Sequence, residues 1–203
     1  DRQEPYSGEI SAPYRLDCAL TYQVGQGSQQ DQALNERVTR ELTTDEWIAI
    51  LHKAHNATIP HILFTGGEPT LREDLPVLIN EAEQLGMVTG LLSDGLRLGD
   101  PEYRKTLIAK GLDHLMLVFD LNNPEEWQLL KDILAEDLFT TVHLTLHEGE
   151  DLRPHIDKLT KMGTNALSLS VVDKDLFDEL QVLRNYAAIQ QLDLVWDLPV
   201  PYS

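Results

Sequence analysis

Short apolar runs rich in branched and aromatic residues alternate with amphipathic stretches along the chain. The runs begin near residues 15, 61, 87, 114, 141, 166 and 192, and from the second run onward successive starts lie 25 to 27 residues apart. Runs that are apolar on both faces are typical of strands buried in a parallel sheet. Their regular alternation with helical patterns predicts a series of βα units.

The helical stretches carry their own start and stop signals. Thr43 followed by Glu46 has the pattern of a capping box, in which side chain and backbone satisfy each other at the helix start. Asp100 and Asn123 each precede a proline, which predicts an N-cap followed by a first-turn proline. Gly163 is expected just past the end of a helix.

The number of units predicts an incomplete barrel. Six βα units and a seventh strand fit into 203 residues, whereas a complete eight-fold barrel needs ~250 residues. We therefore expect a single α/β domain over residues 1–203, a partial (β/α)6 TIM-like barrel with a seventh strand and an N-terminal extension at residues 1–13. A doubly wound sheet is the alternative.

The first interval is longer than the others. The run at residue 15 and the run at residue 61 are 46 residues apart, and the excess is the polar, glycine-bearing segment 23–42. This segment follows the carboxyl end of a predicted strand, where the loops of βα barrels form active sites. A loop of this length is usually functional or disordered.

Charge and composition narrow the function classes. The chain has 34 acidic and 16 basic residues and a formal net charge of -18, which disfavours nucleic acids and anionic membranes as partners. Apolar runs stay well short of the ~20 residues of a membrane span, so we expect a cytoplasmic protein. A single cysteine, Cys18, excludes an internal disulfide and any multi-cysteine metal site supplied by this chain alone.

The most distinctive motif is FTGGEPTLR, which follows the second strand. Gly66 and Gly67 allow the backbone to pass close to a ligand or to adopt positive φ, and Glu68 places a carboxylate directly behind them. A tight corner between strand and loop is the alternative interpretation of the same residues.

Three segments together resemble the radical SAM superfamily, most closely its branch that modifies peptides and cofactor precursors. They are LDCALTYQ with the long loop after it, LTTDEWIAIL, and IPHILFTGGEPTLREDLPVLI. The resemblance implies the partial (β/α)6 barrel. It also implies a CxxxCxxC loop that holds a [4Fe-4S] cluster, whose open iron binds S-adenosylmethionine.

The cysteine positions of that loop fall on Val24, Ser28 and Asp31. Iron–sulfur ligation requires soft thiolates, which these three side chains do not provide. Cys18 lies six residues before the first ligand position, in a predicted strand, and cannot substitute. The cluster loop is therefore degenerate, and we expect no [4Fe-4S] cluster and no catalytic residues.

The resemblance also implies a set of cofactor-binding residues. In the family the GGEP turn lies against the methionine amino group, the turn after strand three contributes, and strand four ends in an acidic residue. The matching positions here are Gly66, Gly67, Glu68, Pro69, Ser93, Asp94 and Asp120. Loss of the two contacts from iron costs about 3–6 kcal/mol, or about 10²- to 10⁴-fold in affinity, so any S-adenosylmethionine binding should be weak.

These observations favour a noncatalytic scaffold or a module that binds another protein or a peptide. The first alternative is cluster-independent binding of S-adenosylmethionine, another nucleotide or a peptide in the barrel mouth. The second is a radical SAM enzyme whose cluster cysteines are missing from this form of the chain. A hard cation is a further alternative, with five candidate carboxylates: Asp17, Asp31, Glu68, Asp94 and Asp120.

Overall fold

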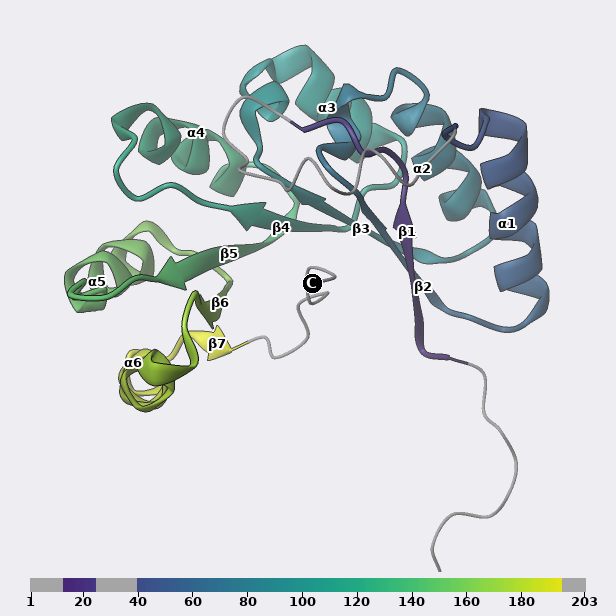
Figure 1. The fold of residues 1–203 in the computed structure, drawn as a ribbon. Coiled ribbons are helices and arrows are strands. Elements are labelled where there is room, and N and C mark those ends of the chain that lie inside the picture. Colours follow the sequence, from purple (N-terminus) through teal and green to yellow (C-terminus); the bar gives the residue numbers. More distant parts are fainter. Residues whose placement is uncertain (1–12, 25–39, 195–203) are drawn as a thin grey trace, which may run out of the picture.

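The computed structural model describes residues 13–24 and 40–194, and in this part of the chain seven parallel strands form one curved sheet (Figure 1). The strand order follows the sequence from β1 to β7, so β1 and β7 are the two edges and the sheet is an open, partial barrel. The strands are β1 (Arg15–Ala19), β2 (His61–Thr65), β3 (Val88–Ser93), β4 (His114–Val118), β5 (Phe139–Leu146), β6 (Ala166–Val171) and β7 (Asp193–Leu194). Each strand pairs in parallel with the next, for example Cys18 with Phe64 and Leu144 with Leu169.

Helices cover the convex side of this sheet (Figure 1). They are α1 (Thr44–Asn56), α2 (Leu75–Gln84), α3 (Pro101–Ala109), α4 (Pro124–Leu134), α5 (Arg153–Met162) and α6 (Phe177–Ile189). Short 3-10 helices follow three strands: η2 (Pro69–Leu71), η3 (Leu96–Gly99) and η4 (Lys174–Leu176). The predicted parallel α/β partial barrel with a seventh strand is confirmed.

The predicted helix starts are confirmed in detail. The Thr43 hydroxyl accepts from the Glu46 amide, and the Glu46 carboxylate accepts from the Thr43 amide, which completes the capping box. The side chains of Asp100 and Asn123 accept from the amides two residues on, and a proline follows each of them. Gly163 ends α5 with φ of 83°, a backbone conformation that glycine adopts without strain.

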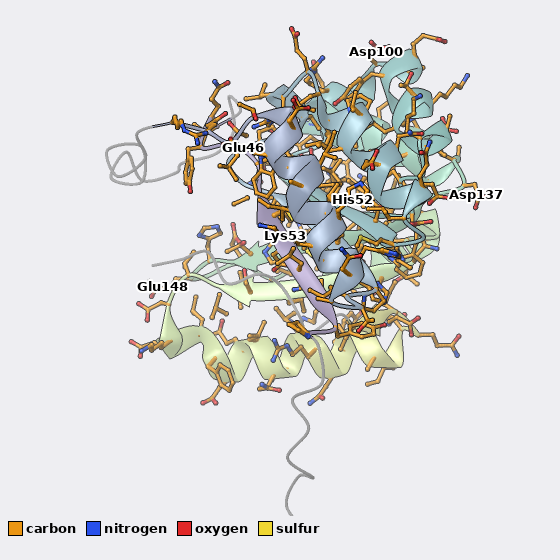
Figure 2. The ribbon with its side chains drawn as sticks, turned by 90° about the vertical axis from the view of Figure 1, so that its right-hand side faces the viewer. Glu46, His52, Lys53, Asp100, Asp137 and Glu148 are labelled. Carbon is orange, nitrogen blue, oxygen red and sulfur yellow. The ribbon has the colours of Figure 1, made fainter. Side chains whose placement is uncertain are left out.

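The core is the layer between the sheet and the helices. Strand residues that face the helices, such as Phe64, Leu91 and Val142, are fully buried and pack with helix residues such as Leu51 and Leu78. Polar residues of α1, including Glu46, His52 and Lys53, lie on the outer surface (Figure 2). Burial of the apolar stripes is the main stabilising term for such a layer.

Not every prediction falls within the described residues. The N-terminal extension lies almost wholly outside them, as do Ser28 and Asp31 and most of the long segment 23–42. Within the described residues, no helix is long and apolar enough to cross a lipid bilayer.

Candidate functional site

The GGEP turn is held against the segment that follows β1. The Gly67 amide donates to Thr21 O and the Glu68 amide donates to Gln23 O, each at 2.7 Å. A Cβ atom at Gly67 would lie 1.9 Å from Gln23 O, and one at Gly66, where φ is 132°, would lie 2.4 Å from Thr21 O. The two glycines are therefore required by the close approach of two backbone segments, whether or not a ligand binds.

The Glu68 side chain points into the protein, where it is 3% exposed. Its Oε1 accepts from the Thr70 amide at 3.1 Å, the Thr70 hydroxyl at 2.6 Å and the Ser93 hydroxyl at 2.8 Å. Its Oε2 accepts from the Asp94 amide at 2.8 Å. Burial raises the pKa of Glu68, while these hydrogen bonds oppose the rise. The carboxylate caps η2 and joins the turns after β2 and β3.

Two charged residues fix the ends of the long segment between β1 and α1. Glu41 Oε1 accepts from the Thr21 hydroxyl at 2.5 Å and from the Tyr22 amide at 3.0 Å. The Arg72 guanidinium donates to Leu20 O at 3.0 Å and to Leu42 O at 2.9 Å. We call Glu41 and Arg72 the neck pair. Sequence reasoning missed it, although an arginine directly after GGEPTL was the visible signal.

Arg72 is itself oriented by Asp74. The guanidinium forms two hydrogen bonds to the Asp74 carboxylate, at 2.8 and 2.6 Å, and hydrogen bonding to Arg72 lowers the pKa of Asp74. The Thr44 hydroxyl also donates to Asp74, at 2.6 Å. Asp74 precedes α2 without capping it, because its carboxylate is used by Arg72 and Thr44.

Whether this chain could hold a [4Fe-4S] cluster depends on the side chains that it offers as iron ligands. Cys18 is 1% exposed among the core residues of β1, and burial raises the pKa of its thiol to about 12. Its side chain packs among the core residues in the layer between the sheet and the helices. At the first predicted cluster position stands Val24, which is an exposed valine. With one buried thiol in the whole sequence, this chain's donor set does not fit the cluster.

Asp120 lies apart from the Glu68 network. It is exposed after the carboxyl end of β4, where its Oδ1 accepts from the Asn122 amide at 2.9 Å and its own amide donates to Glu126 Oε2 at 2.7 Å. It lines a cavity of about 220 Å³ between the ends of β4 and β5, and Glu68 does not line this cavity. The candidate residues therefore form one group around the buried Glu68 and Ser93 with the half-buried Asp94, and a separate exposed position at Asp120.

The inner face of the sheet carries a polar cluster on β5 and β6. His143 Nδ1 lies 3.3 Å from the Ser168 hydroxyl and Nε2 lies 3.1 Å from the Ser170 hydroxyl, which is 3.2 Å from the Thr145 hydroxyl. Burial lowers the pKa of His143 to about 4, so the imidazole is neutral near pH 7. The sequence predicted strands that are apolar on both faces, whereas these side chains make the inner face of β5 and β6 polar.

Within residues 13–24 and 40–194, no three His, Cys, Asp or Glu side chains are grouped so that they could hold a metal ion. Asp31, one of the five carboxylates considered for a hard cation, lies outside these ranges.

The sequence model of the Radical SAM superfamily matches residues 18–174. The chain belongs to the radical SAM superfamily. Among curated proteins, it is 30% identical over 165 residues to the PqqA peptide cyclase of Streptomyces rochei, covering 73% of this chain and 44% of that protein. It is 38% identical over 93 residues to the PqqA peptide cyclase of Granulibacter bethesdensis, covering 44% and 25% respectively. The chain thus spans less than half the length of these radical SAM relatives.

Solved structures show the same fold. SuiB of Streptococcus suis matches with a TM-score of 0.72 at 14% identity, over 93% of this chain and 50% of that chain. SuiB bound to its precursor peptide SuiA matches with a TM-score of 0.71 at 14% identity, over 91% of this chain and 48% of that chain. At this identity the likeness concerns the radical SAM barrel fold alone.

Proposed function

We propose that this chain is a radical SAM barrel that works without a [4Fe-4S] cluster, as a noncatalytic module that binds a peptide segment of a partner. The observation that carries the proposal is the position of the one cysteine. Cys18 is buried in the core on β1, and its raised pKa keeps the thiol protonated near neutral pH. Cluster chemistry, in contrast, requires three thiolates at the barrel mouth.

The GGEP turn supports the same proposal. Three donors bind Glu68 Oε1 and a fourth donates to Oε2, and all four come from the turn after β2, the last residue of β3 and the turn after β3. The backbone of Thr21 and Gln23 leaves no room for a Cβ atom at Gly66 or Gly67, which is a steric reason for glycine at both positions. The motif can therefore persist as architecture after its ligand is lost, and its assignment to S-adenosylmethionine remains a prediction.

A peptide is the partner class that the relatives favour. Two curated relatives are named PqqA peptide cyclases, and SuiB has been solved with its precursor peptide. A net charge of -18 disfavours nucleic acid and anionic membranes as partners. Binding of a peptide needs the open mouth of the barrel but does not need the cluster.

Cluster-independent binding of S-adenosylmethionine or another nucleotide is the second candidate. Asp120 favours it, because this carboxylate is exposed beside a cavity at the carboxyl ends of the strands, where open α/β folds bind ligands.

Anaerobic reconstitution with iron and sulfide tests the proposal. The purified protein and the variant Cys18→Ser are treated in parallel and analysed for iron, sulfide and the spectrum of a cluster. We expect both proteins to retain far less iron than the about four atoms of a complete cluster. Loading of about four irons per chain in the wild type would overturn the proposal and indicate an enzyme with ligands that the family motif does not describe.

A further inference from the structure

A cavity of about 220 Å³ opens between the carboxyl ends of β4 and β5. Its wall includes Val118, Leu121, Asp120, Glu150, His143 and Thr145. The volume is below the ~300–1,000 Å³ of pockets that enclose whole small molecules. It suits one side chain of a longer ligand better than a nucleotide.

One wall of this cavity is apolar and open. Val118, at the end of β4, is 44% exposed, although it sits in a strand whose neighbours Leu117 and Phe119 are buried. Leu121 lies in the loop that follows. An exposed valine of this kind gives the methylene stem of a long side chain a surface to cover.

The rim of the cavity is acidic. Asp120 Oδ1 accepts from the Asn122 amide, and Glu150 Oε2 accepts from the His147 amide at 3.2 Å. Each of these bonds uses one oxygen of the carboxylate, and the second oxygen takes no part in it. Burial raises the pKa of the neighbouring Glu126, and the carboxylates of Asp120 and Asp94 raise it further. Negative charge is therefore concentrated at this part of the mouth.

Two cationic side chains of α5 are held by other partners. Arg153 forms an ion pair with Asp151 at 2.8 Å, and Lys158 Nζ lies 3.5 Å from the centre of the Trp127 ring. His143, which also lines the cavity, is a neutral imidazole and does not repel a cation.

We propose that this cavity, which we call the mouth pocket, binds a basic side chain of the peptide partner. The stem lies against Val118 and Leu121, and the cationic group lies between the carboxylates of Asp120 and Glu150. This inference rests on the proposed function, and it adds the chemistry of the residue that is recognised. The pairing of planar or compact cations with carboxylates is a common source of specificity at protein surfaces.

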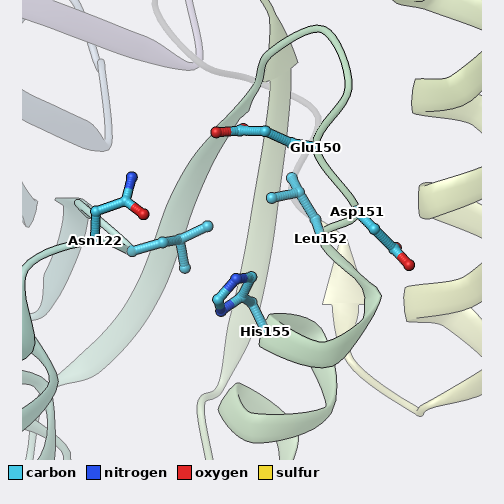
Figure 3. A pocket seen from close by; sticks show the side chains of 6 residues that line it. Asn122, Glu150, Asp151, Leu152 and His155 are labelled. Atoms are coloured by element: carbon cyan, nitrogen blue, oxygen red, sulfur yellow. The ribbon is translucent and has the colours of Figure 1, made fainter.

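A second cavity of about 210 Å³ continues from the first and shares Leu121, Asn122 and Glu150 with it. In Figure 3, Glu150, Asn122 and His155 point toward a common space, whereas Asp151 points away from it. The two cavities together give room for the recognised side chain and for part of the next residue of a peptide.

The test is a titration of isotope-labelled protein, followed by NMR, with Nα-acetyl-arginine amide. We expect saturable shifts of the amides of residues 118–122 and 145–150, weaker at high salt because exposed charges are screened. Nα-acetyl-norleucine amide, which has the apolar stem without the charge, should bind at least about threefold more weakly. Free arginine should also bind more weakly, because its own carboxylate would face an acidic rim; equal or tighter binding of free arginine would point to a free metabolite and overturn the peptide partner.

Two variants remove charge and keep shape. Asp120→Asn and Glu150→Gln retain the oxygen that accepts from the backbone amide, so the loops should stay folded, and each should weaken the blocked arginine about threefold or more. Glu148→Gln is the matched control, because Glu148 lies in the same loop, projects outward and does not line the pocket (Figure 2). Unchanged affinity in both pocket variants, or no shift at residues 118–122, would overturn the inference.

Failure of this inference and failure of the proposed function are distinguishable. If blocked arginine does not bind and iron loading is also absent, the mouth pocket is wrong and the cluster-free module stands. If iron loads to about four atoms per chain, the proposed function fails, whatever the arginine titration shows.

Discussion

The Ser93 hydroxyl at the end of β3 donates to Glu68 Oε1 at 2.8 Å. This bond links the turn after β2 to the turn after β3 inside the protein, and the same Ser93 oxygen accepts from the Gly95 amide at 2.9 Å. A carboxylate that the family motif assigns to a ligand site is thus part of the internal framework of this fold.

Removal of the Glu68 carboxylate should lower stability. Glu68→Ala leaves the buried amide of Thr70 and the partly buried amide of Asp94 without their acceptor, and we expect a loss of about 2–4 kcal/mol in the free energy of unfolding. Glu68→Gln places an amide group among donors and should lose about 1–3 kcal/mol. Urea unfolding measures both, with the exposed Glu73→Ala as a control expected within about 0.5 kcal/mol of wild type. Wild-type stability of Glu68→Ala would contradict the structural role.

A methyl group at Gly67 should also be poorly tolerated. Gly67→Ala places Cβ 1.9 Å from Gln23 O, so the segment after β1 has to move, with an expected loss of about 2–4 kcal/mol. Gly99→Ala is the matched control, because its Cβ would meet only Leu129 Cδ1 at 3.8 Å. Thermal unfolding of the two variants should separate them clearly; equal melting temperatures would show that the backbone contact is not needed.

His143 should make stability depend on pH. Burial lowers its pKa to about 4 from 6.5, so the unfolded chain binds the proton more readily. The contribution of the neutral imidazole is fully present above pH 6.5 and is lost as pH falls toward 4, by up to about 3 kcal/mol.

Unfolding measured across this window should show a steeper loss for wild type than for His143→Asn. His147→Asn, on the exposed loop after β5, serves as the control and should follow wild type. Parallel curves for wild type and His143→Asn would mean that His143 is solvated.

Cys18 should be inert in the folded protein. Its thiol is 1% exposed with a pKa raised to about 12, and thiol reagents attack the thiolate. At pH 8 a disulfide reagent should label the native protein at least about 100-fold more slowly than the urea-unfolded protein, because burial and pKa act together. Fast labelling without denaturant would show that this thiol lies at the surface, where it could act as a metal ligand.

The repeating elements were predictable from the sequence because each strand and helix has a local cause. The capping box at Thr43 and the proline after Asp100 act within a few residues, and the runs from 61 to 192 mark the strands within about two residues. The family motif, FTGGEPTLR, was visible for the same reason.

The arrangement of the site could not be predicted, because it depends on residues far apart in the sequence. Glu41 and Arg72, the neck pair, bind partners that lie 19 to 52 residues away in the sequence. Glu68 turns inward because Ser93 and the Asp94 amide offer it donors, whereas Asp120 stays at the surface after β4. Sequence placed both carboxylates near the mouth but could not orient them.

Calorimetric titration with S-adenosylmethionine tests the central claim most directly. Without iron contacts and with Glu68 already bound internally, we expect no saturable heat up to about 1 mM ligand, in wild type and in Asp120→Ala alike. Saturable binding in the micromolar range that Asp120→Ala abolishes would contradict the account and assign the barrel mouth to a nucleotide.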